Sequence, residues 1–388
     1  MVSPDARTYL ETAADTSKGA LVKTTLKLRK ELGPPRTHLV IAQAELRRRA
    51  GVKFRNASEM FFTRQLLEQA TDERVAAYKA SRLPSDMKVI DLCCGIGGDL
   101  MAFADRGPVI AVDRDPIATI LAEANCKING LENVDFRVDD VSEQNLEGFG
   151  AWHLDPDRRS DGKRSIKLEN HDPGPEVIEQ FLAGNGSAAV KLAPAARLLE
   201  QWSELAEVEW IGTRGECKQQ VLWFNELARY PGRRAATIVL PGEAPPYTIY
   251  GVPVKKLPVA EKLGRYVYEP HAAVLASHLT GLLSDKYGLP CISPRIPYLT
   301  SDKLVSDPAL ACFEVEEVLP VDPKHMKSAI RKRRIGNLEV KKRGVRIDPE
   351  DVRKQINPRG DEAGTLIIVP VNKKVSALLT HRITTLGA

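Results

Sequence analysis

Carboxylates close three apolar runs in the middle of the chain, and a glycine-rich turn follows the first of them. Asp91 lies in the first run, Asp113 ends the second, and Asp139-Asp140 follow the third. If these runs are parallel strands, their carboxyl ends meet at one edge of a sheet, which is where such sheets bind ligands. A glycine turn between a strand and a helix lets the backbone approach a ligand closely. The pattern therefore predicts a binding site for a nucleotide-like cofactor.

The turn distinguishes between two classes of cofactor. Dinucleotide-binding folds use Gly-x-Gly-x-x-Gly, whose third glycine packs the helix against the strand. Here Gly95-Ile96-Gly97 is followed by Leu100 at the position of that glycine. The carboxylate of Asp91 would also lie unfavourably beside a pyrophosphate, whereas it suits a sulfonium cofactor that carries an ammonium group. The sequence favours the sulfonium cofactor.

At these residues the sequence resembles the class I S-adenosylmethionine-dependent methyltransferases, whose first motif is matched by Asp91-Leu-Cys-Cys-Gly95-Ile-Gly97. The resemblance implies S-adenosylmethionine as the cofactor. It implies that Asp113 holds the ribose, since one carboxylate can accept hydrogen bonds from both hydroxyls, and that Asp140 or its neighbour Asp139 meets the adenine amino group. The cofactor-binding residues expected in this region are Asp91, Cys93, Cys94, Gly95, Ile96, Gly97, Asp113, Arg114, Asp139 and Asp140.

Thr71 is a further cofactor residue implied by the resemblance. Nucleic-acid and cap methyltransferases often carry a Thr-Pro motif before the first strand, and its residues touch the methionine end of the cofactor. Thr71 matches that motif, but Asp72 stands in place of the proline. The alternative is that Thr71 is only the N-cap of a helix that runs to about residue 81.

The acceptor motif is expected at residues 152–159, Trp-His-Leu-Asp-Pro-Asp-Arg-Arg, after a fourth strand. Amino-group methyltransferases that act on nucleic acid carry Asp/Asn-Pro-Pro-aromatic here. The acid orients the amine and the aromatic ring stacks on the base. The resemblance therefore implies catalytic positions at Asp155 and Pro156. The aromatic residue is replaced, so the stacking platform is absent.

Arg158 and Arg159, which follow this motif, have the chemistry to bind phosphates, because a guanidinium is a planar group with five donors. The alternative is an Asp-Pro turn whose two arginines pair with Asp157 and Asp161. Lys191 ends the next expected strand and also points to the cleft, although a lysine in that position is more often solvated.

A second chemical signal lies in the C-terminal part of the chain. Residues 324–346 hold ten Lys and Arg against one acid, a net charge of +9, while the whole chain carries +5. Positive charge concentrated in one module is typical of a protein that binds a polyanion. A solvated basic face is the alternative. The residues expected to bind RNA here are Arg331, Lys332, Arg333 and Arg334.

Alternating strands and helices must position these residues, which predicts an α/β fold with one doubly wound, Rossmann-like sheet. Upstream, apolar residues spaced by three and four predict helices, the first of them broken at Pro34-Pro35. Downstream, residues 365–371 form a strand in which Pro370 indicates an edge position. The seven strands expected in the sheet are residues 88–92, 109–113, 134–138, 152–154, 188–192, 208–213 and 236–240.

The whole chain resembles a family of bacterial class I methyltransferases that end in a THUMP-like domain. THUMP domains bind RNA in several tRNA-modifying enzymes, so the resemblance implies RNA, such as tRNA, as the partner. The resemblance divides the chain into a helical domain (1–86), a class I methyltransferase domain (87–243), a small ferredoxin-like α+β domain (244–312) and a THUMP-like basic domain (313–388).

Composition narrows the class of protein further. No run of 18 apolar residues is present, and the N-terminus lacks the apolar core of a signal peptide, so we expect a cytoplasmic protein that crosses no membrane. The six cysteines form no Cys-x-x-Cys pair, which fits neither a zinc site nor a disulfide framework, so we expect no metal.

Three functions remain open at this point. The first is an S-adenosylmethionine-dependent methyltransferase acting on structured RNA. The second is an RNA-binding protein that keeps the cofactor fold without catalysis, which the missing aromatic residue would explain. The third is a small-molecule methyltransferase, in which the basic window would be incidental.

Overall fold

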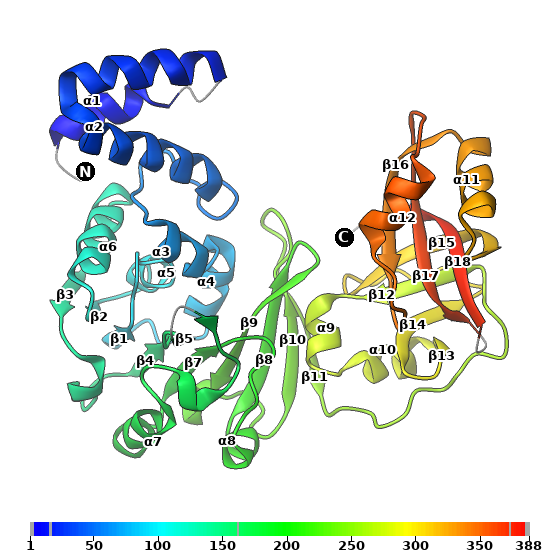
Figure 1. The fold of residues 1–388 in the computed structure, drawn as a ribbon. Helices are drawn as coiled ribbons and strands as arrows, with labels where there is room; N and C mark the ends of the chain where they lie inside the picture. Colours follow the sequence, from blue (N-terminus) through cyan, green and yellow to red (C-terminus); the bar gives the residue numbers. More distant parts are fainter. Residues whose placement is uncertain (1–3, 15–17, 161–162, 372–373, 385–388) are drawn as a thin grey trace. The chain divides into compact units, whose positions relative to one another are not determined.

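The computed structural model describes residues 4–14, 18–160, 163–371 and 374–384 (Figure 1). The chain divides into two compact units. The first unit is made of residues 1–208 and 219–232, and the second of residues 209–218 and 233–388. The residues that carry the expected cofactor site all belong to the first unit. The four-domain division from the sequence stays a prediction.

The first unit begins with helices α1 (Pro4–Thr12), α2 (Lys18–Ala50), α3 (Arg64–Gln69) and α4 (Glu73–Ala80). The expected break in the long helix is confirmed, because Gly33 leaves the helical conformation at φ 74° and ψ 167° just before Pro34-Pro35. A hydrophobic core joins these helices to the next part of the unit. It extends from Leu10 and Leu28 to Ile96 in the glycine-rich loop and Leu121 in helix α6 (Pro116–Ile128).

The parallel strands are β1 (Val89–Leu92), β2 (Val109–Asp113), β3 (Val134–Val138), β4 (Ala151–Leu154) and β7 (Ala188–Leu192). β1 pairs in parallel with β2 and β4, and the parallel pairing continues from β2 to β3 and from β4 to β7. β1, β4 and β7 are apolar and buried almost throughout, as strands covered on both faces require. The remaining elements here are α5 (Leu100–Ala104), α6 (Pro116–Ile128), α7 (Pro175–Gly184), α8 (Glu200–Leu205) and the short pair β5 (Arg159–Ser160) and β6 (Lys163–Arg164).

The expected count of seven strands is wrong, since the sheet that contains β1 has nine strands among the described residues. Their order is β11-β10-β8-β9-β7-β4-β1-β2-β3. The additional strands are β9 (Glu216–Trp223), antiparallel to β7, and β11 (Tyr247–Gly251), antiparallel to β10 (Arg234–Ile238). The first half of β9 is polar and partly exposed, so it lacks the apolar run that marks the other strands. The strand expected at 208–213 is β8 (Glu207–Thr213).

The second unit contains a seven-stranded sheet of order β13-β14-β12-β15-β18-β17-β16. The boundary expected near residue 312 falls inside its strand β15, so the two ranges 244–312 and 313–388 share this sheet. The strands are β12 (Tyr266–Pro270), β13 (Cys291–Ser293), β14 (Ile296–Ser301), β15 (Leu310–Pro320), β16 (Ile335–Lys342), β17 (Glu362–Val371) and β18 (Lys374–Ile383), and the helices are α9 (Ala272–Ala276), α10 (Thr280–Tyr287), α11 (Pro323–Lys332) and α12 (Pro349–Ile356).

The expected edge position of the strand that contains Pro370 is wrong. β17 lies between β18 and β16, so it is an inner strand of this sheet. Its pairing with β16 ends at Ile368, however, and only β18 is opposite Pro370. The missing amide hydrogen of Pro370 is therefore tolerated on the side where the partner strand has already ended.

His271 makes the stability of the second unit depend on pH. It is the N-cap of α9, its Nδ1 accepts a hydrogen bond from the amide of Ala273 (3.1 Å), and its buried Nε2 has no partner among the described residues. Burial lowers the pKa of His271 from 6.5 to about 4. The unfolded chain therefore takes up a proton before the folded one as the pH falls.

We expect His271 to stabilise the fold fully above pH 6.5 and to lose this contribution, at most about 3 kcal/mol, as the pH falls from 6.5 to 4. His271→Asn keeps a good N-cap but does not titrate. Denaturant unfolding at pH 7 and pH 4 should show a smaller loss of stability for H271N than for the wild type. His381→Asn, at an exposed position of β18, is the control and should behave like the wild type. Equal losses in all three proteins would contradict the prediction.

Candidate cofactor and acceptor site

A cavity of about 310 Å³ lies in the first unit, where β1, β2 and β4 end. The structure brings most of the predicted site residues together at this cavity. Of the predicted cofactor residues, Gly97 and Asp139 do not line it. The predicted residues that do are Thr71, Asp91, Cys93, Cys94, Gly95, Ile96, Asp113, Arg114, Asp140, Asp155, Pro156 and Arg158.

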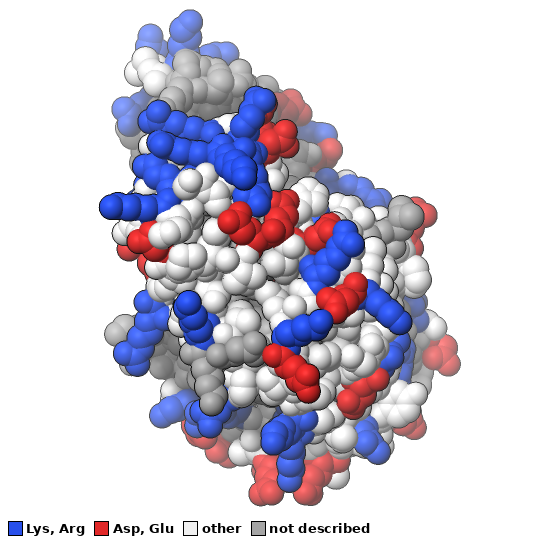
Figure 2. Space-filling view, turned by 90° about the vertical axis from the view of Figure 1, so that its right-hand side faces the viewer, with Lys and Arg blue, Asp and Glu red and all other residues white. Residues whose placement is uncertain are grey.

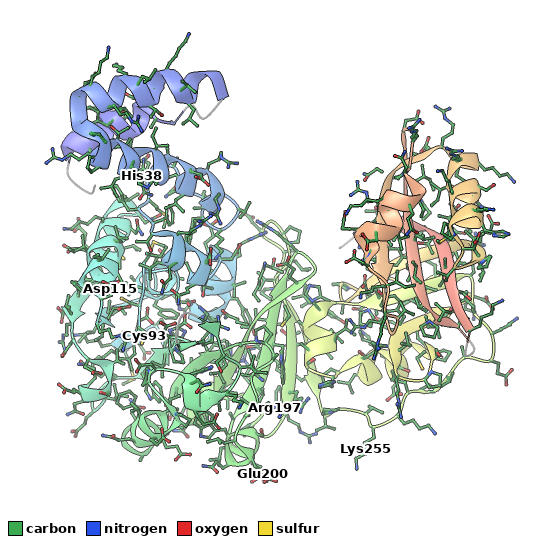
Figure 3. All side chains as sticks on the ribbon, viewed as in Figure 1. His38, Cys93, Asp115, Arg197, Glu200 and Lys255 are labelled. Carbon is green, nitrogen blue, oxygen red and sulfur yellow. The ribbon has the colours of Figure 1, made fainter. Side chains whose placement is uncertain are left out.

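The loop after β1 wraps one side of the cavity because three of its residues adopt positive φ angles. Cys93, Gly95 and Gly97 have φ of 62°, 57° and 86° (Cys93 is labelled in Figure 3). Only glycine adopts this region without strain, which explains two of the three residue types. Gly98 is needed for a different reason, since a Cβ there would lie 3.0 Å from the backbone nitrogen of Thr71. The loop is therefore held close to the segment before β1.

Asp113 links this loop to the end of β2. Its Oδ2 accepts a hydrogen bond from the amide of Gly95 (2.8 Å), and its Oδ1 accepts one from the amide of Asp115 (3.0 Å), which lies at the start of α6 (Figure 3). Burial raises the pKa of Asp113, and these two amides counteract that shift. Each carboxylate oxygen can accept a second hydrogen bond. Asp113 is therefore fixed in position and still has acceptor capacity for hydroxyls in the cavity.

The two acids after β3 differ in their surroundings. Asp140 lines the cavity and caps the short helix Val141–Glu143, where Ser142 donates to it and lowers its pKa. Asp139 instead accepts hydrogen bonds from the amide of Asp140 (2.9 Å) and from Gln144 Nε2 (2.8 Å). Of the pair, Asp140 lines the cavity and Asp139 does not.

Beneath the cavity lies a buried polar network that sequence reasoning largely missed. His153 stands opposite Asp91 in the pairing of β4 with β1, and its Nδ1 lies 2.7 Å from Asp91 Oδ1. Its Nε2 lies 3.2 Å from Nζ of Lys79, which comes from α4. Lys79 is fully buried and pairs with Asp99 at 2.7 Å. His153 is part of the motif at 152–159, so its position near the site was visible, whereas Lys79 carries no local signal.

The charges in this network shift one another's protonation equilibria. Burial alone would raise the pKa of Asp99, but Lys79, His153 and Lys191 together lower it well below the ordinary value. Burial lowers the pKa of Lys79, and Asp99 opposes that shift. Burial raises the pKa of Asp91, and His153 opposes that shift. Asp99 is therefore the ionised centre of the network.

Asp91 has one carboxylate oxygen available. Its side chain is 1% exposed, and Oδ2 has no hydrogen-bond partner among the described residues. A buried acceptor without a partner costs free energy unless a ligand supplies a donor. Because Asp91 lines the cavity, an ammonium group bound there would satisfy Oδ2. The residues present therefore fit the sulfonium cofactor expected from the sequence.

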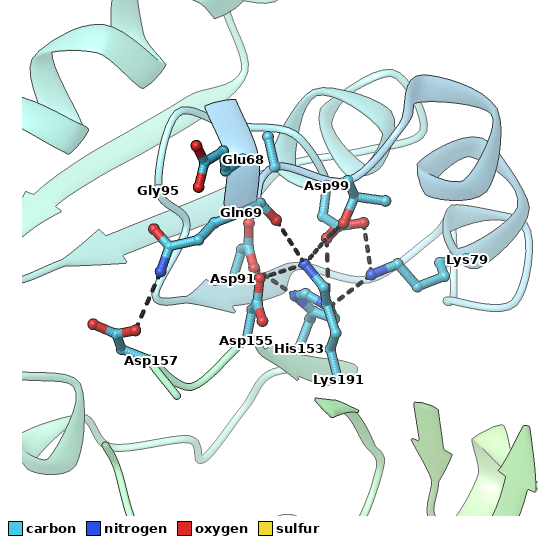
Figure 4. Close-up of polar contacts among 12 residues, drawn as sticks. Glu68, Gln69, Lys79, Asp91, Gly95, Asp99, His153, Asp155, Asp157 and Lys191 are labelled. Atoms are coloured by element: carbon cyan, nitrogen blue, oxygen red, sulfur yellow. Dashed lines mark hydrogen bonds and ion pairs between the residues drawn. The ribbon is translucent and has the colours of Figure 1, made fainter. Parts of the chain in front are cut away.

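Lys191 joins the network to the acceptor motif, as Figure 4 shows. Its Nζ lies 2.5 Å from Asp155 Oδ2 and 3.4 Å from the backbone oxygen of Gln69, and Asp99 Oδ2 is 3.9 Å away. Burial lowers the pKa of Lys191, but Asp155 and Asp99 outweigh it and raise the pKa. A lysine at this strand end is therefore a buried partner of Asp155, and the solvated alternative is wrong.

Thr71 and Arg159 are the other predicted residues of this region. The N-cap of α4 is Asp72 and not Thr71, and the side chain of Asp72 accepts a hydrogen bond from the amide of Arg74. The hydroxyl of Thr71 instead donates a hydrogen bond to Asp99 Oδ2 at 2.6 Å. The backbone of Arg159 lies in β5, and its side chain, like the whole of Asp161, lies outside the described residues.

The basic C-terminal residues belong to the second unit and are partly neutralised by acids outside the 324–346 window. Arg333 pairs with Glu316 at 2.6 Å and Glu317 at 2.9 Å, and Arg334 pairs with Asp361 at 2.8 Å. Arg331 and Lys332, in the last turn of α11, have no ion pair with a described residue. On the face that Figure 2 shows, acidic side chains lie among the Lys and Arg side chains.

No helix in the described part of the chain is long and apolar enough to cross a membrane. No group of three or more His, Cys, Asp or Glu in the described ranges could hold a metal ion.

Comparison with known proteins gives matches over both units. Residues 83–153 match the methyltransferase domain family, and residues 310–382 match the family described as THUMP domain-like. An uncharacterised S-adenosylmethionine-dependent methyltransferase of Mycobacterium tuberculosis, found in strains CDC 1551 and H37Rv, is 30% identical over 336 residues, which cover 84% of this chain and 90% of the relative. The crystal structure of a candidate methyltransferase from Porphyromonas gingivalis W83 has a similar fold, with a TM-score of 0.75, 20% identity and 98% coverage of each chain.

Proposed function

Since this chain belongs to the S-adenosylmethionine-dependent methyltransferases, we propose that its acceptor is RNA, either tRNA or another structured RNA. The observation that carries the choice of RNA is the C-terminal region. It matches the THUMP domain-like family, and its helix α11 ends in Arg331 and Lys332, whose charges no described acid neutralises. Exposed, unpaired cations at a helix end suit phosphate groups.

The cavity residues have separate proposed roles. Asp91, Asp113 and Asp140 hold the ammonium group, the ribose and the adenine of the cofactor, respectively. Bound S-adenosylmethionine supplies a methyl group already activated by its positive sulfur, so alignment of the acceptor provides most of the acceleration that the protein must contribute. The loop Cys93–Gly97 and Thr71 close the cavity around the cofactor.

Asp155 is proposed to align the acceptor. Its Oδ2 is held by Lys191, and no described residue donates to its Oδ1. The ammonium group of Lys191 lies 2.5 Å from this carboxylate, and in the ion pair the carboxylate acts as an acceptor of hydrogen bonds. The acceptor group must therefore carry a hydrogen, as an amino, imino or hydroxyl group does. Arg158 lines the same cavity and has donors for a neighbouring phosphate.

The test is transfer of a labelled methyl group to RNA from cells that lack this protein. We expect labelled RNA with the wild type. Asp113→Ala should give neither transfer nor calorimetric binding of S-adenosylmethionine. Arg331→Glu/Lys332→Glu should reduce transfer while leaving cofactor binding intact.

The matched control for charge is Lys255→Glu/Lys256→Glu, an equal change at exposed positions of the same unit, which should keep wild-type transfer. Label in small molecules but not in RNA would favour the small-molecule alternative. Cofactor binding and tight RNA binding without any transfer would favour the catalytically silent alternative.

A further inference from the structure

Helix α2 carries a second concentration of positive charge that the proposed function does not use. Its 33 residues hold nine Lys and Arg against two Glu, a net charge of +7, while the whole chain carries +5. None of its described Lys or Arg side chains has an ion pair with a described acid. His38, labelled in Figure 3, lies exposed on the same helix. The exposed cations whose side chains are described are Lys23, Lys27, Arg29, Lys30, Arg36 and Arg48.

A groove of about 810 Å³ lies at the C-terminal end of this helix. Its apolar lining comes from α1, α2, the segment after α2 and the end of α6, and includes Leu10, Phe54 and Phe61. Four arginines also line it. Two are already used: Arg7 pairs with Glu11 and Glu59, and Arg47 donates to the backbone of Glu59 and Met60 and covers the ring of Phe61.

The other two arginines of the groove, Arg48 and Arg55, are exposed, and neither side chain has a hydrogen bond or ion pair to a described residue. A groove with an apolar lining and unneutralised guanidinium groups at its surface matches a single nucleic-acid strand, whose bases are apolar on their faces and whose backbone is anionic. The long run of unpaired cations on α2 extends this match beyond the groove itself.

The groove is connected to the cofactor loop through Asn125. The amide of Phe61 donates to Asn125 Oδ1 (2.8 Å), and Asn125 Nδ2 donates to the backbone oxygens of Phe61 (3.1 Å) and Ile96 (3.1 Å). Asn125 is fully buried, Phe61 lines the groove, and Ile96 lines the cofactor cavity. The hydrophobic core that contains Leu28 also contains Ile96. The groove and the cavity are thus two parts of one compact unit.

We infer that α2 and the groove at its end bind a single-stranded segment of the acceptor RNA, with phosphates on the α2 cations, Arg48 and Arg55. This inference rests on the proposed function. It gives the helical N-terminal part the role of fixing the RNA relative to Asp155, because both lie in the first unit. The positive charge of α2 can be counted from the sequence. Only the structure shows the groove and the hydrogen bonds of Asn125 that connect this part of the chain to the cofactor cavity.

The test uses the full chain and the variant Arg48→Glu/Arg55→Glu. We expect its affinity for RNA to fall about tenfold or more near 0.15 M salt, and the salt dependence of binding to weaken by about two units of log K per log [salt]. Methyl transfer to RNA should fall in parallel. Calorimetric affinity for S-adenosylmethionine should not change, which also reports that the cavity is folded. Arg48→Gln/Arg55→Gln should give a smaller loss, since it removes charge without reversing it.

The matched control is Lys88→Glu/Arg106→Glu, the same change of charge at exposed positions. Both residues precede strands β1 and β2, at the amino ends of these strands and away from the cavity at their carboxyl ends. This control should bind RNA like the wild type. If the wild type binds RNA and Arg48→Glu/Arg55→Glu binds it equally well, the inference is overturned, and an acidic protein segment becomes the better occupant of the groove. If the wild type binds no RNA, the proposed function itself fails.

Discussion

Replacing Asp155 by Asn should lower the rate of methyl transfer by about 10²–10³-fold and leave the affinity for S-adenosylmethionine nearly unchanged. The amide keeps the shape of the side chain but removes the negative charge that accepts a hydrogen bond from the acceptor. It also leaves Lys191 buried without its closest counter-charge at 2.5 Å. Single-turnover transfer from labelled S-adenosylmethionine, with calorimetry for cofactor affinity, measures the two effects separately.

Asp157→Asn is the matched control for this variant. Asp157 lies two residues further along the same loop, lines the same cavity, and accepts a hydrogen bond from Gln69 Nε2 at 3.2 Å. If proximity to the cavity were sufficient, both substitutions would slow transfer equally. A rate for Asp155→Asn within a few-fold of the wild type would contradict the role assigned to Asp155.

Lys191→Met tests how Asp155 is held. We expect this variant to transfer the methyl group more slowly than the wild type while binding S-adenosylmethionine with similar affinity, because Asp155 loses the ammonium group that holds its Oδ2. Single-turnover transfer and calorimetry measure these two quantities. A transfer rate equal to that of the wild type would contradict this role of Lys191.

The clustering of the proposed cofactor residues at one cavity could be predicted from the sequence because their signals are local. The glycine turn is one continuous segment, and Asp113 and Asp140 directly follow apolar runs, so each residue is found by its position at a strand end. The network beneath it could not be predicted in this way. Lys79 stands between Tyr78 and Ala80 on a short helix, and its partner Asp99 lies 20 residues further along the chain. Only the packing of α4 on α5 brings them together.

The same difference between local and non-local information explains why some predictions from the sequence were wrong. The net charge of residues 324–346 treats Arg333 and Arg334 as unneutralised. In the fold, Arg333 pairs with an acid of β15, and Arg334 pairs with the acid that precedes β17. Pro370 correctly indicated a missing backbone hydrogen bond, but this does not make β17 an edge strand. Its neighbour β16 pairs with it over only part of its length, up to Ile368. Thr71 and Asp72 both suit an N-cap, and what separates them is that Thr71 has a buried acceptor in Asp99.

Lys79→Met should lower the free energy of unfolding by about 3–5 kcal/mol, because it leaves Asp99 buried without its ammonium partner. Asp99 is 6% exposed, so water cannot replace Lys79. Lys88→Met, at an exposed lysine before β1, is the control and should change the stability little. Urea unfolding at pH 7, followed by circular dichroism, gives the three free energies. A loss near that of the control would contradict the prediction.

The double variant Lys79→Met/Asp99→Asn separates loss of a charge pair from loss of packing. With both charges removed, no uncompensated ion stays buried, so the double variant should be more stable than Lys79→Met alone. pH gives a second measurement. Since the folded-state pKa of Asp99 is lowered, its contribution is present above its unfolded pKa and is lost as the pH falls below that value. Variants that lack the Asp99 carboxylate should lose less stability on acidification than the wild type does.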